Sequence, residues 1–377
     1  MEKIQDAERS PPAIVALKLA AVVFLFFVFL VGVNALSSSF KMMGAGFAQT
    51  LFNVSSNPII ALFSGMLATA IIQSSSTTTS IIVGLCSSGA LSIGGAVPMI
   101  MGANLGTSVT NTLASLGHLR DRKNFATTFS AATVHDIFNI LSVAVLLPFE
   151  MATGFIEKLA TILGQGLYGV FSSVKFSSPI KTLLKPVVKG LKSFVEEIMG
   201  LENMTGGAAL ALISASIIMI SLAFVVKIMK GLAESHKTDI MENLLSARSY
   251  VSILVGAVIT FSVQSSSITT SLMIPMAGAR ILSLKSIFPI TVGANIGTTT
   301  TAIIASLSGN VAGLIIALVH FIFNCLGMLI WYSIKPLRRV PLYLAEKLGE
   351  VCAQKRILGV AYIAIVFFVL PLGLIAL

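Results

Sequence analysis

The sequence has little charge and few cysteines. Only 11% of its 377 residues are Asp, Glu, Lys or Arg and 55% are hydrophobic, with a mean hydropathy of +0.95. Soluble domains carry about 25% charged residues, so an ordinary soluble protein is excluded. The three cysteines, Cys86, Cys325 and Cys352, are scattered along the chain. Their spacing indicates neither a disulfide framework nor a metal site.

Acidic residues are scarcer than basic ones, and the formal net charge is +10. Because Lys and Arg collect at the ends of apolar segments, they indicate membrane orientation rather than a nucleic-acid partner. A helix crosses a bilayer with about 20 apolar residues, and segments 14–36, 208–229 and 357–377 have that length. We therefore expect an all-α polytopic protein in the cell (inner) membrane. Segment 14–36 lacks a small-residue cleavage site, which indicates a retained first span with a cytoplasmic N-terminus.

Two polar motifs occur twice at the same spacing. Residues 73–80 (QSSSTTTS) return as 264–271 (QSSSITTS), and 102–110 (GANLGTSVT) return as 293–301 (GANIGTTTT), both 191 positions later. Duplicated polar clusters in an apolar chain are typical of transporters built from internal repeats. Placing the basic loops in the cytoplasm makes the two repeats inverted relative to one another.

The repeats and the apolar segments together predict four parts of the chain. They are a first repeat (1–149), an outer connection (150–206), a second repeat (207–335), and a basic linker with a final transmembrane helix (336–377). Each repeat should hold a re-entrant helical hairpin, at about 57–92 and 249–282, with its QSSS run at the tip. The 15 residues of segment 58–72 would rise only about 22 Å as a helix, which is too short to cross.

The serine runs suit a helix break better than a continuous helix. Neighbouring side chains on a helix are about 100° apart, so four hydroxyls converge on one ligand only where the helix is interrupted. A break also frees backbone N–H groups and directs the positive end of a helix dipole into the gap, which suits an anion. The alternative is that these hydroxyls bond back to their own helix or join neighbouring helices.

The second pair of motifs offers oxygen ligands. Asn104, Thr107, Ser108 and Asn111 follow helical spacing, and Asn295, Thr298 and Thr299 repeat it, with Ala302 in place of the last Asn. Amide, hydroxyl and backbone oxygens suit a small hard cation such as Na⁺ in a dry site. Packing between helices is the alternative interpretation.

A looser third pair carries ionisable groups. His135-Asp136 and Asn139 recur as His320 and Asn324, now 185 positions later. Ionisable groups inside a membrane are functional by default. We expect these five residues to support the site from a second layer, holding the hairpins in place.

The outer connection carries a basic amphipathic pattern. In 181–199, lysines at 181, 185, 189 and 192 lie opposite apolar residues. The pattern predicts a helix that either lies in the membrane surface or packs, solvated, on the rest of the protein.

Taken together, the paired QSSS runs, the Asn-x-Gly-Thr cluster that follows each of them and the His135 and His320 segments resemble the type II sodium-dependent phosphate cotransporter family. The resemblance covers about 50–148 and 205–335. It implies Na⁺-coupled uptake of inorganic phosphate, with both substrates held between the hairpins in a bacterial member of the family. It departs from the animal members in lacking their cysteine-containing outer loop and long cytoplasmic tail.

The resemblance also implies site residues by position. Phosphate would be bound by Gln73, Ser74, Ser75, Ser76, Thr77, Gln264, Ser265, Ser266 and Ser267. The co-transported Na⁺ would be bound by Gln73, Asn104, Thr107, Gln264, Asn295 and Thr298. The partners we expect are phosphate, Na⁺ and the lipid bilayer, and a homodimer stays open.

Three rival classes use the same residues. A carrier for sulfate or a carboxylate would need the same physics. A channel would need an open pore rather than broken helices. An intramembrane hydrolase would need a serine beside His135 and Asp136, but the sequence has no G-x-S-x-G motif. We therefore expect a transporter and no enzyme.

Overall fold

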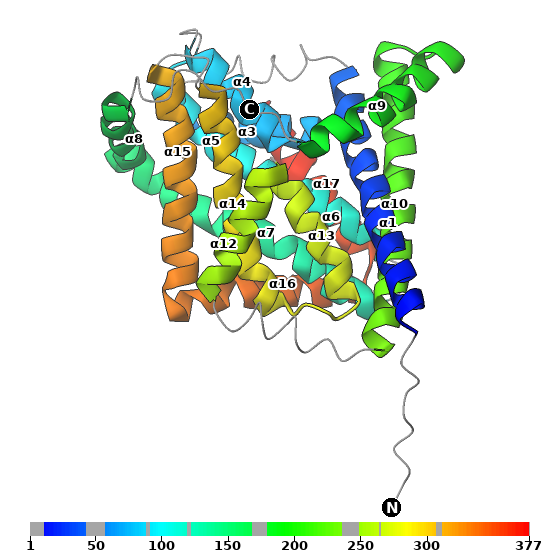
Figure 1. The fold of residues 1–377 in the computed structure, drawn as a ribbon. Helices are drawn as coiled ribbons and strands as arrows, with labels where there is room; N and C mark the ends of the chain where they lie inside the picture. Colours follow the sequence, from blue (N-terminus) through cyan, green and yellow to red (C-terminus); the bar gives the residue numbers. More distant parts are fainter. Residues whose placement is uncertain are drawn as a thin grey trace, which may run out of the picture.

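The protein is described here by a computed structural model, which describes residues 11–42, 57–87, 91–118, 122–167, 179–235, 249–263, 265–306 and 311–376. All regular structure within these ranges is helical (Figure 1). Three helical stretches among them are long and apolar enough to cross a bilayer, namely Asn124–Thr153, Val311–Ser333 and Ile357–Ile375. The expectation of an all-α membrane protein is confirmed.

The first half of the chain contains α1 (Pro12–Met42), α3 (Pro58–Ile72), α4 (Ser75–Ser87), α5 (Ile93–Thr107), α6 (Val109–Ser115), the short turn η1 (Leu116–His118) and α7 (Arg122–Thr153). The connection contains α8 (Phe155–Leu167), α9 (Pro179–Ser193) and η2 (Phe194–Ile198). The second half contains α10 (Asn203–Ser235), α12 (Ser249–Val263), α13 (Ser266–Gly278), α14 (Leu284–Ser306), α15 (Val311–Met328) and η3 (Leu329–Ser333). The chain ends with α16 (Lys335–Gln354), α17 (Ile357–Ala364), η4 (Ile365–Val369) and α18 (Leu370–Ile375).

Helix boundaries recur at the spacing of the sequence motifs. Helices α1, α3, α4 and α5 begin at residues 12, 58, 75 and 93, and α10, α12, α13 and α14 begin 191 positions later, at 203, 249, 266 and 284. Helix α6 ends at residue 115 and α14 at 306, again 191 positions apart. One difference interrupts the pattern. The first half breaks at Ser108, between α5 and α6, where α14 is continuous.

Glycines let two pairs of helices pack closely in the same way. A Cβ on Gly102 of α5 would overlap the carbonyl oxygen of Leu62 on α3, and a Cβ on Gly293 of α14 would overlap that of Ile253 on α12. Small residues at such contacts let helix backbones approach each other in a membrane. The α3–α5 and α12–α14 contacts are therefore the same contact made twice.

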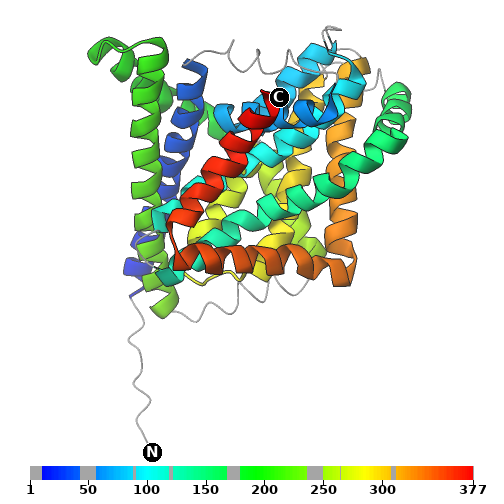
Figure 2. The same cartoon turned by 180° about the vertical axis from the view of Figure 1, so that it is seen from behind.

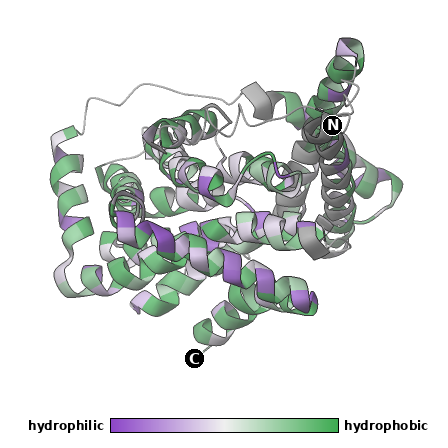
Figure 3. Ribbon diagram, turned by 90° about the horizontal axis from the view of Figure 1, so that it is seen from below, coloured by the Kyte–Doolittle hydropathy of each residue, from purple (hydrophilic) through white to green (hydrophobic). Residues whose placement is uncertain are grey.

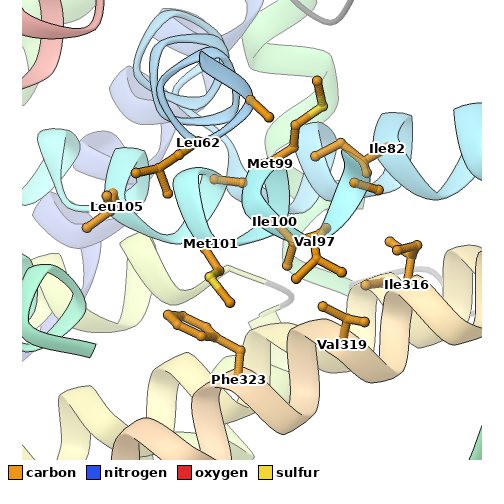
Figure 4. Packing of buried hydrophobic residues seen from close by; sticks show 14 of the residues in the cluster. Leu62, Ile82, Val97, Met99, Ile100, Met101, Leu105, Ile316, Val319 and Phe323 are labelled. Atoms are coloured by element: carbon orange, nitrogen blue, oxygen red, sulfur yellow. The ribbon is translucent and has the colours of Figure 1, made fainter. Parts of the chain in front are cut away.

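The core lies between the two halves. Met101 and Val97 of α5 point toward Phe323 and Val319 of α15, with Ile82 of α4 beside them (Figure 4). All five side chains are buried. Because α15 belongs to the second half, this cluster joins the halves rather than closing either one separately.

Two amphipathic helices, α8 and α16, each pack on the half of the molecule to which they do not belong in sequence. Helix α8 follows α7 and packs on α15, whereas α16 follows α15 and packs on α7. Helix α16 crosses the lower edge of the molecule (Figure 2), and hydrophilic residues are concentrated along it when that face is viewed (Figure 3). The amphipathic stripe of α16 explains both its packing and its exposed charges.

Helices α1 and α10 form a pair at one side of the molecule (Figure 1). Helix α9 packs against α1, and Leu184 on its apolar face is 1% exposed. Helices α9 and η2 thus cover most of segment 181–199, and α9 contacts α1. Leu183 and Ile198 remain exposed beside the lysines.

Candidate functional site

The first serine run begins at a helix break. Helix α3 ends at Gln73, whose backbone is left-handed (φ 56°, ψ 30°), and α4 begins at Ser75. A left-handed residue that is not glycine is strained and is found at helix ends and functional sites. The Gln73 side chain is buried. Its Nε2 donates to the carbonyl of Ala70 (2.6 Å), and its Oε1 accepts from the Thr110 hydroxyl of α6 (2.6 Å).

The second serine run begins at an equivalent break. Ser265 caps α13 by accepting from the backbone N–H of Ile268, and the N–H of Ser266 donates to the Thr298 hydroxyl of α14 at 3.1 Å. Each break is thus fastened to the Asn-Gly-Thr cluster of its own half. Gln264 and the side chain of Thr77 lie outside the described residues.

The second run also reaches the first half. The Ser267 hydroxyl donates to the carbonyl of Thr107 at 3.3 Å. One turn further along α13, Thr270 and Ser271 donate to the amide oxygen of Asn111 at 3.0 and 2.9 Å. The structure therefore brings the second serine run to the first Asn-Gly-Thr cluster, although 160 residues separate Thr107 from Ser267.

The histidines cross between halves. Nε2 of His135 on α7 bonds the amide oxygen of Asn295. The amide nitrogen of Asn295 in turn donates to Oδ1 of Asn139 at 2.8 Å. In the reverse direction, Nε2 of His320 on α15 bonds the amide oxygen of Asn104 at 3.3 Å. Each cluster's Asn is thus held by the histidine of the other half.

These bonds define what the predicted Na⁺ ligands contact. The amide oxygens of Asn104 and Asn295 face histidines, the Thr107 hydroxyl donates to the carbonyl of Ala103 (3.0 Å), and the Thr298 hydroxyl accepts from Ser266. All four side chains are buried. Each already has a protein partner, and two of them contact the second serine run, Thr298 through the N–H of Ser266 and Thr107 through its carbonyl.

Asp136 meets a residue that sequence reasoning missed. Its carboxylate accepts from the hydroxyl of Tyr362 on α17 at 3.1 Å, and Asp136 is 1% exposed. Tyr362 lies in the final apolar span, outside the two predicted repeats. The available signal was a phenol in an otherwise apolar span, because a buried tyrosine hydroxyl usually finds a partner. Two further contacts, Thr110 to Gln73 and Asn111 to α13, were also absent from the predicted site.

Positive side chains are missing from this interior. Among the described residues, the buried histidines and carboxylates are His135, Asp136, Glu150 and His320, and no Lys or Arg is buried. Both ring nitrogens of His135 are bonded to amides, those of Asn111 and Asn295. The site therefore offers hydroxyls, amides and helix ends as neutral donors and oxygen ligands.

Comparison with known proteins gives one consistent result. The family described as Na⁺/Pi-cotransporter matches residues 28–170 and 217–344. Sodium-dependent phosphate transport protein 2B from Homo sapiens is 33% identical over 93% of this chain and 63% of its own length. Protein 2A from Ovis aries is 33% identical over 98% of this chain and 68% of its own, and protein 2A from Rattus norvegicus is 34% identical over 94% and 67%. No solved structure matches the chain.

Proposed function

The chain belongs to the Na⁺/Pi-cotransporter family, and from this premise we propose that it couples the inward movement of Na⁺ to the uptake of inorganic phosphate. It spans 63% of the length of the human relative. The similarity covers the segments that carry the duplicated motifs, and the relatives' names describe sodium-dependent phosphate transport. They describe transport and no enzymatic reaction.

The observation that carries the proposal is the pair of helix breaks joined across the halves. Ser267 and the Asn111 amide link the second serine run to the first cluster. Phosphate carries between one and two negative charges at neutral pH. Because no Lys or Arg is buried among the described residues, charge compensation would come from Na⁺ bound beside phosphate, which makes their binding cooperative.

We assign the two substrates to neighbouring oxygens and donors. Phosphate would contact the serines of both runs, with the N-termini of α4 and α13 supplying positive dipole ends. Na⁺ would be bound by oxygens from Gln73, Asn104, Thr107, Asn295 and Thr298, with Gln264 as a further ligand. Asn104 and Asn295 would exchange a histidine contact for an ion contact when Na⁺ enters.

The transport cycle would use two inverted repeats with alternating access. The repeats would span 1–149 and 207–335, joined by an outer connection at 150–206 and followed by the linker and final helix at 336–377. Three observations support this. The helix boundaries recur at 191 residues. The pair α3 and α4 and the pair α12 and α13 are each separated at a serine run. In Figure 1, α3 and α4 lie in the upper part of the molecule, whereas α12 and α13 lie in the lower part. The protein would then lie in the inner membrane with its N-terminus in the cytoplasm.

Uptake of labelled phosphate into proteoliposomes tests the function directly. An inward Na⁺ gradient should drive accumulation that saturates with phosphate, and equimolar choline should abolish it. Labelled sulfate and a labelled dicarboxylate serve as rival substrates in the same vesicles. Accumulation of sulfate in place of phosphate would reassign the substrate, and a flux that fails to saturate would indicate a channel.

Serine variants test the site. Ser75→Ala or Ser266→Ala should lower phosphate uptake by about tenfold or more, because a lost hydrogen bond to a charged group costs about 1.5–3 kcal/mol. Ser216→Ala is a matched control, since Ser216 is exposed on α10 and bonds only its own helix. Normal uptake in both site variants would make the runs packing elements.

A further inference from the structure

One short helix reaches both serine runs. Helix α6 is seven residues long and begins at Val109, directly after the interruption at Ser108. Its residues Thr110 and Asn111 are consecutive, and neither is more than 3% exposed. Neighbouring side chains on a helix point about 100° apart, so these two side chains can contact different parts of the protein.

Thr110 holds the start of the first serine run. Its hydroxyl donates to Oε1 of Gln73 at 2.6 Å, and Nε2 of Gln73 donates to the carbonyl of Ala70 at 2.6 Å. Because a carbonyl can only accept, the bond to Ala70 identifies the nitrogen end of the amide, and Thr110 therefore faces its oxygen. Gln73 is also the left-handed residue that ends α3. Thr110 thus fixes the orientation of the side chain at the first break.

Asn111 holds the second serine run from an adjacent face of the same helix. Its Oδ1 accepts from the hydroxyls of Thr270 and Ser271 at 3.0 and 2.9 Å, and its Nδ2 contacts Nδ1 of His135 at 3.2 Å. Helix α6 packs against both α13 and α7, which carry these partners. The amide is held from two sides, so it cannot turn away from the run without losing a hydrogen bond.

The second half does not make the equivalent contacts. The positions 191 residues after Thr110 and Asn111 are Thr301 and Ala302. Within the described part of the chain the buried hydroxyl of Thr301 has no hydrogen-bond partner, and Ala302 has no polar side chain. Helix α14 also passes through this position without interruption. The side chains that link the two runs here therefore come from α6 and not from α14.

We propose that Thr110 and Asn111 are positioning residues for phosphate binding. This role rests on the proposed function, in which phosphate contacts the serines of both runs. One small anion can bond both runs only if they stay at a fixed separation, and two adjacent contacts from one helix set that separation. A site that is already in place binds more tightly, because less order has to be imposed when the ligand arrives.

Uptake into proteoliposomes tests the two residues. Thr110→Val and Asn111→Ala should each raise the phosphate concentration for half-maximal uptake about two- to tenfold, as expected for a lost neutral hydrogen bond, and should change the maximal rate less. Thr110→Ser keeps the hydroxyl and should behave as the unaltered protein. Thr128→Val is the matched control, since the buried hydroxyl of Thr128 donates to carbonyls of its own helix.

The double variant separates a shared role from two local ones. If α6 sets the separation of the runs, either substitution releases it, so Thr110→Val with Asn111→Ala should bind phosphate no more weakly than the weaker single variant. Two independent local effects would instead multiply. Multiplied effects, or single variants that match the control, would overturn the proposal. Thr110→Val keeps the shape of the side chain, so it carries the test if Asn111→Ala does not fold.

A density map of the Asn111→Ala protein tests the positioning without any substrate. In the unaltered protein the Ser267 hydroxyl lies 3.3 Å from the carbonyl oxygen of Thr107. This distance should lengthen beyond hydrogen-bond range in Asn111→Ala and stay the same in Thr128→Val. An unchanged distance in Asn111→Ala contradicts the proposal. Failure of the unaltered protein to take up phosphate would instead count against the proposed function.

Discussion

In the first half of the molecule, His135 is bonded through both ring nitrogens, whereas in the second half its counterpart His320 is bonded through one. Yet the helices around them begin at equivalent positions, and the same glycines allow the same close contacts. The duplicated backbone packing is thus compatible with two different polar interiors.

The difference has a physical basis. A glycine at a helix contact has no substitute, because any Cβ overlaps the facing carbonyl, so both halves need it. A buried polar atom has several possible partners, including another side chain, its own helix or water. The chemistry of the two halves can therefore diverge while their packing stays the same.

The largest effect is expected where the halves are equivalent. Gly102→Ala and Gly293→Ala should each cost about 3 kcal/mol, because a methyl group overlaps a backbone carbonyl that cannot move aside. Unfolding midpoints and size-exclusion profiles in detergent measure the loss. Gly190→Ala is the control, since a Cβ there meets open space. Tolerance of one substitution and not the other would break the equivalence of the two contacts.

An unequal effect of similar size is expected at the asparagines. Asn295→Ala leaves His135 Nε2 and Asn139 Oδ1 unpaired, whereas Asn104→Ala removes the side-chain bond to His320. At about 1–3 kcal/mol for each buried group left unpaired, the first variant should lose about twice as much stability as the second. Thermal unfolding of both variants in parallel measures this, and equal losses would contradict the asymmetry.

A smaller effect is expected at the contact between the final apolar span and α7. Helices α16 and α17 bring Tyr362 to Asp136 of α7. Tyr362→Phe should lower stability by about 1–2 kcal/mol, since a carboxylate oxygen loses its donor. Tyr343→Phe, on the exposed face of α16, keeps its ring beside Lys347 and serves as the control. A loss no larger than that of the control would show that the contact contributes nothing.

The smallest effect concerns the thiol of α16. Burial raises the pKa of Cys352 from 9.0 to about 11, so the folded protein holds the neutral thiol at pH 8. A folded-state pKa above the unfolded one contributes stability that is fully present below about pH 9 and is lost as the pH rises through about 11. Maleimide labelling followed by peptide mapping should find Cys352 slow at pH 8 and faster above pH 10. Rapid labelling of the folded protein at pH 8 would contradict this.

The helix break at Gln73 could be predicted from the sequence, because the length of the apolar segment before it requires a break. A 15-residue apolar segment before Gln73 is too short to cross a bilayer, and the structure breaks α3 at that residue. The stripe of Asn104, Thr107 and Asn111 was predicted as one helix, but Ser108 interrupts it. Helical spacing identifies residues that share a face, yet it does not identify where backbone bonds are interrupted.

By itself, the sequence determined that the chain is helical and membrane-bound, that two polar motifs recur at 191 residues, and that regular helix is interrupted at the serine runs. These follow from local properties, namely hydrophobic length, spacing and repetition. Only the tertiary structure decided that His135 pairs with Asn295 and His320 with Asn104, and that α17 supplies a partner for Asp136. Such pairings depend on which helix faces which, and that is set by packing among segments more than 150 residues apart.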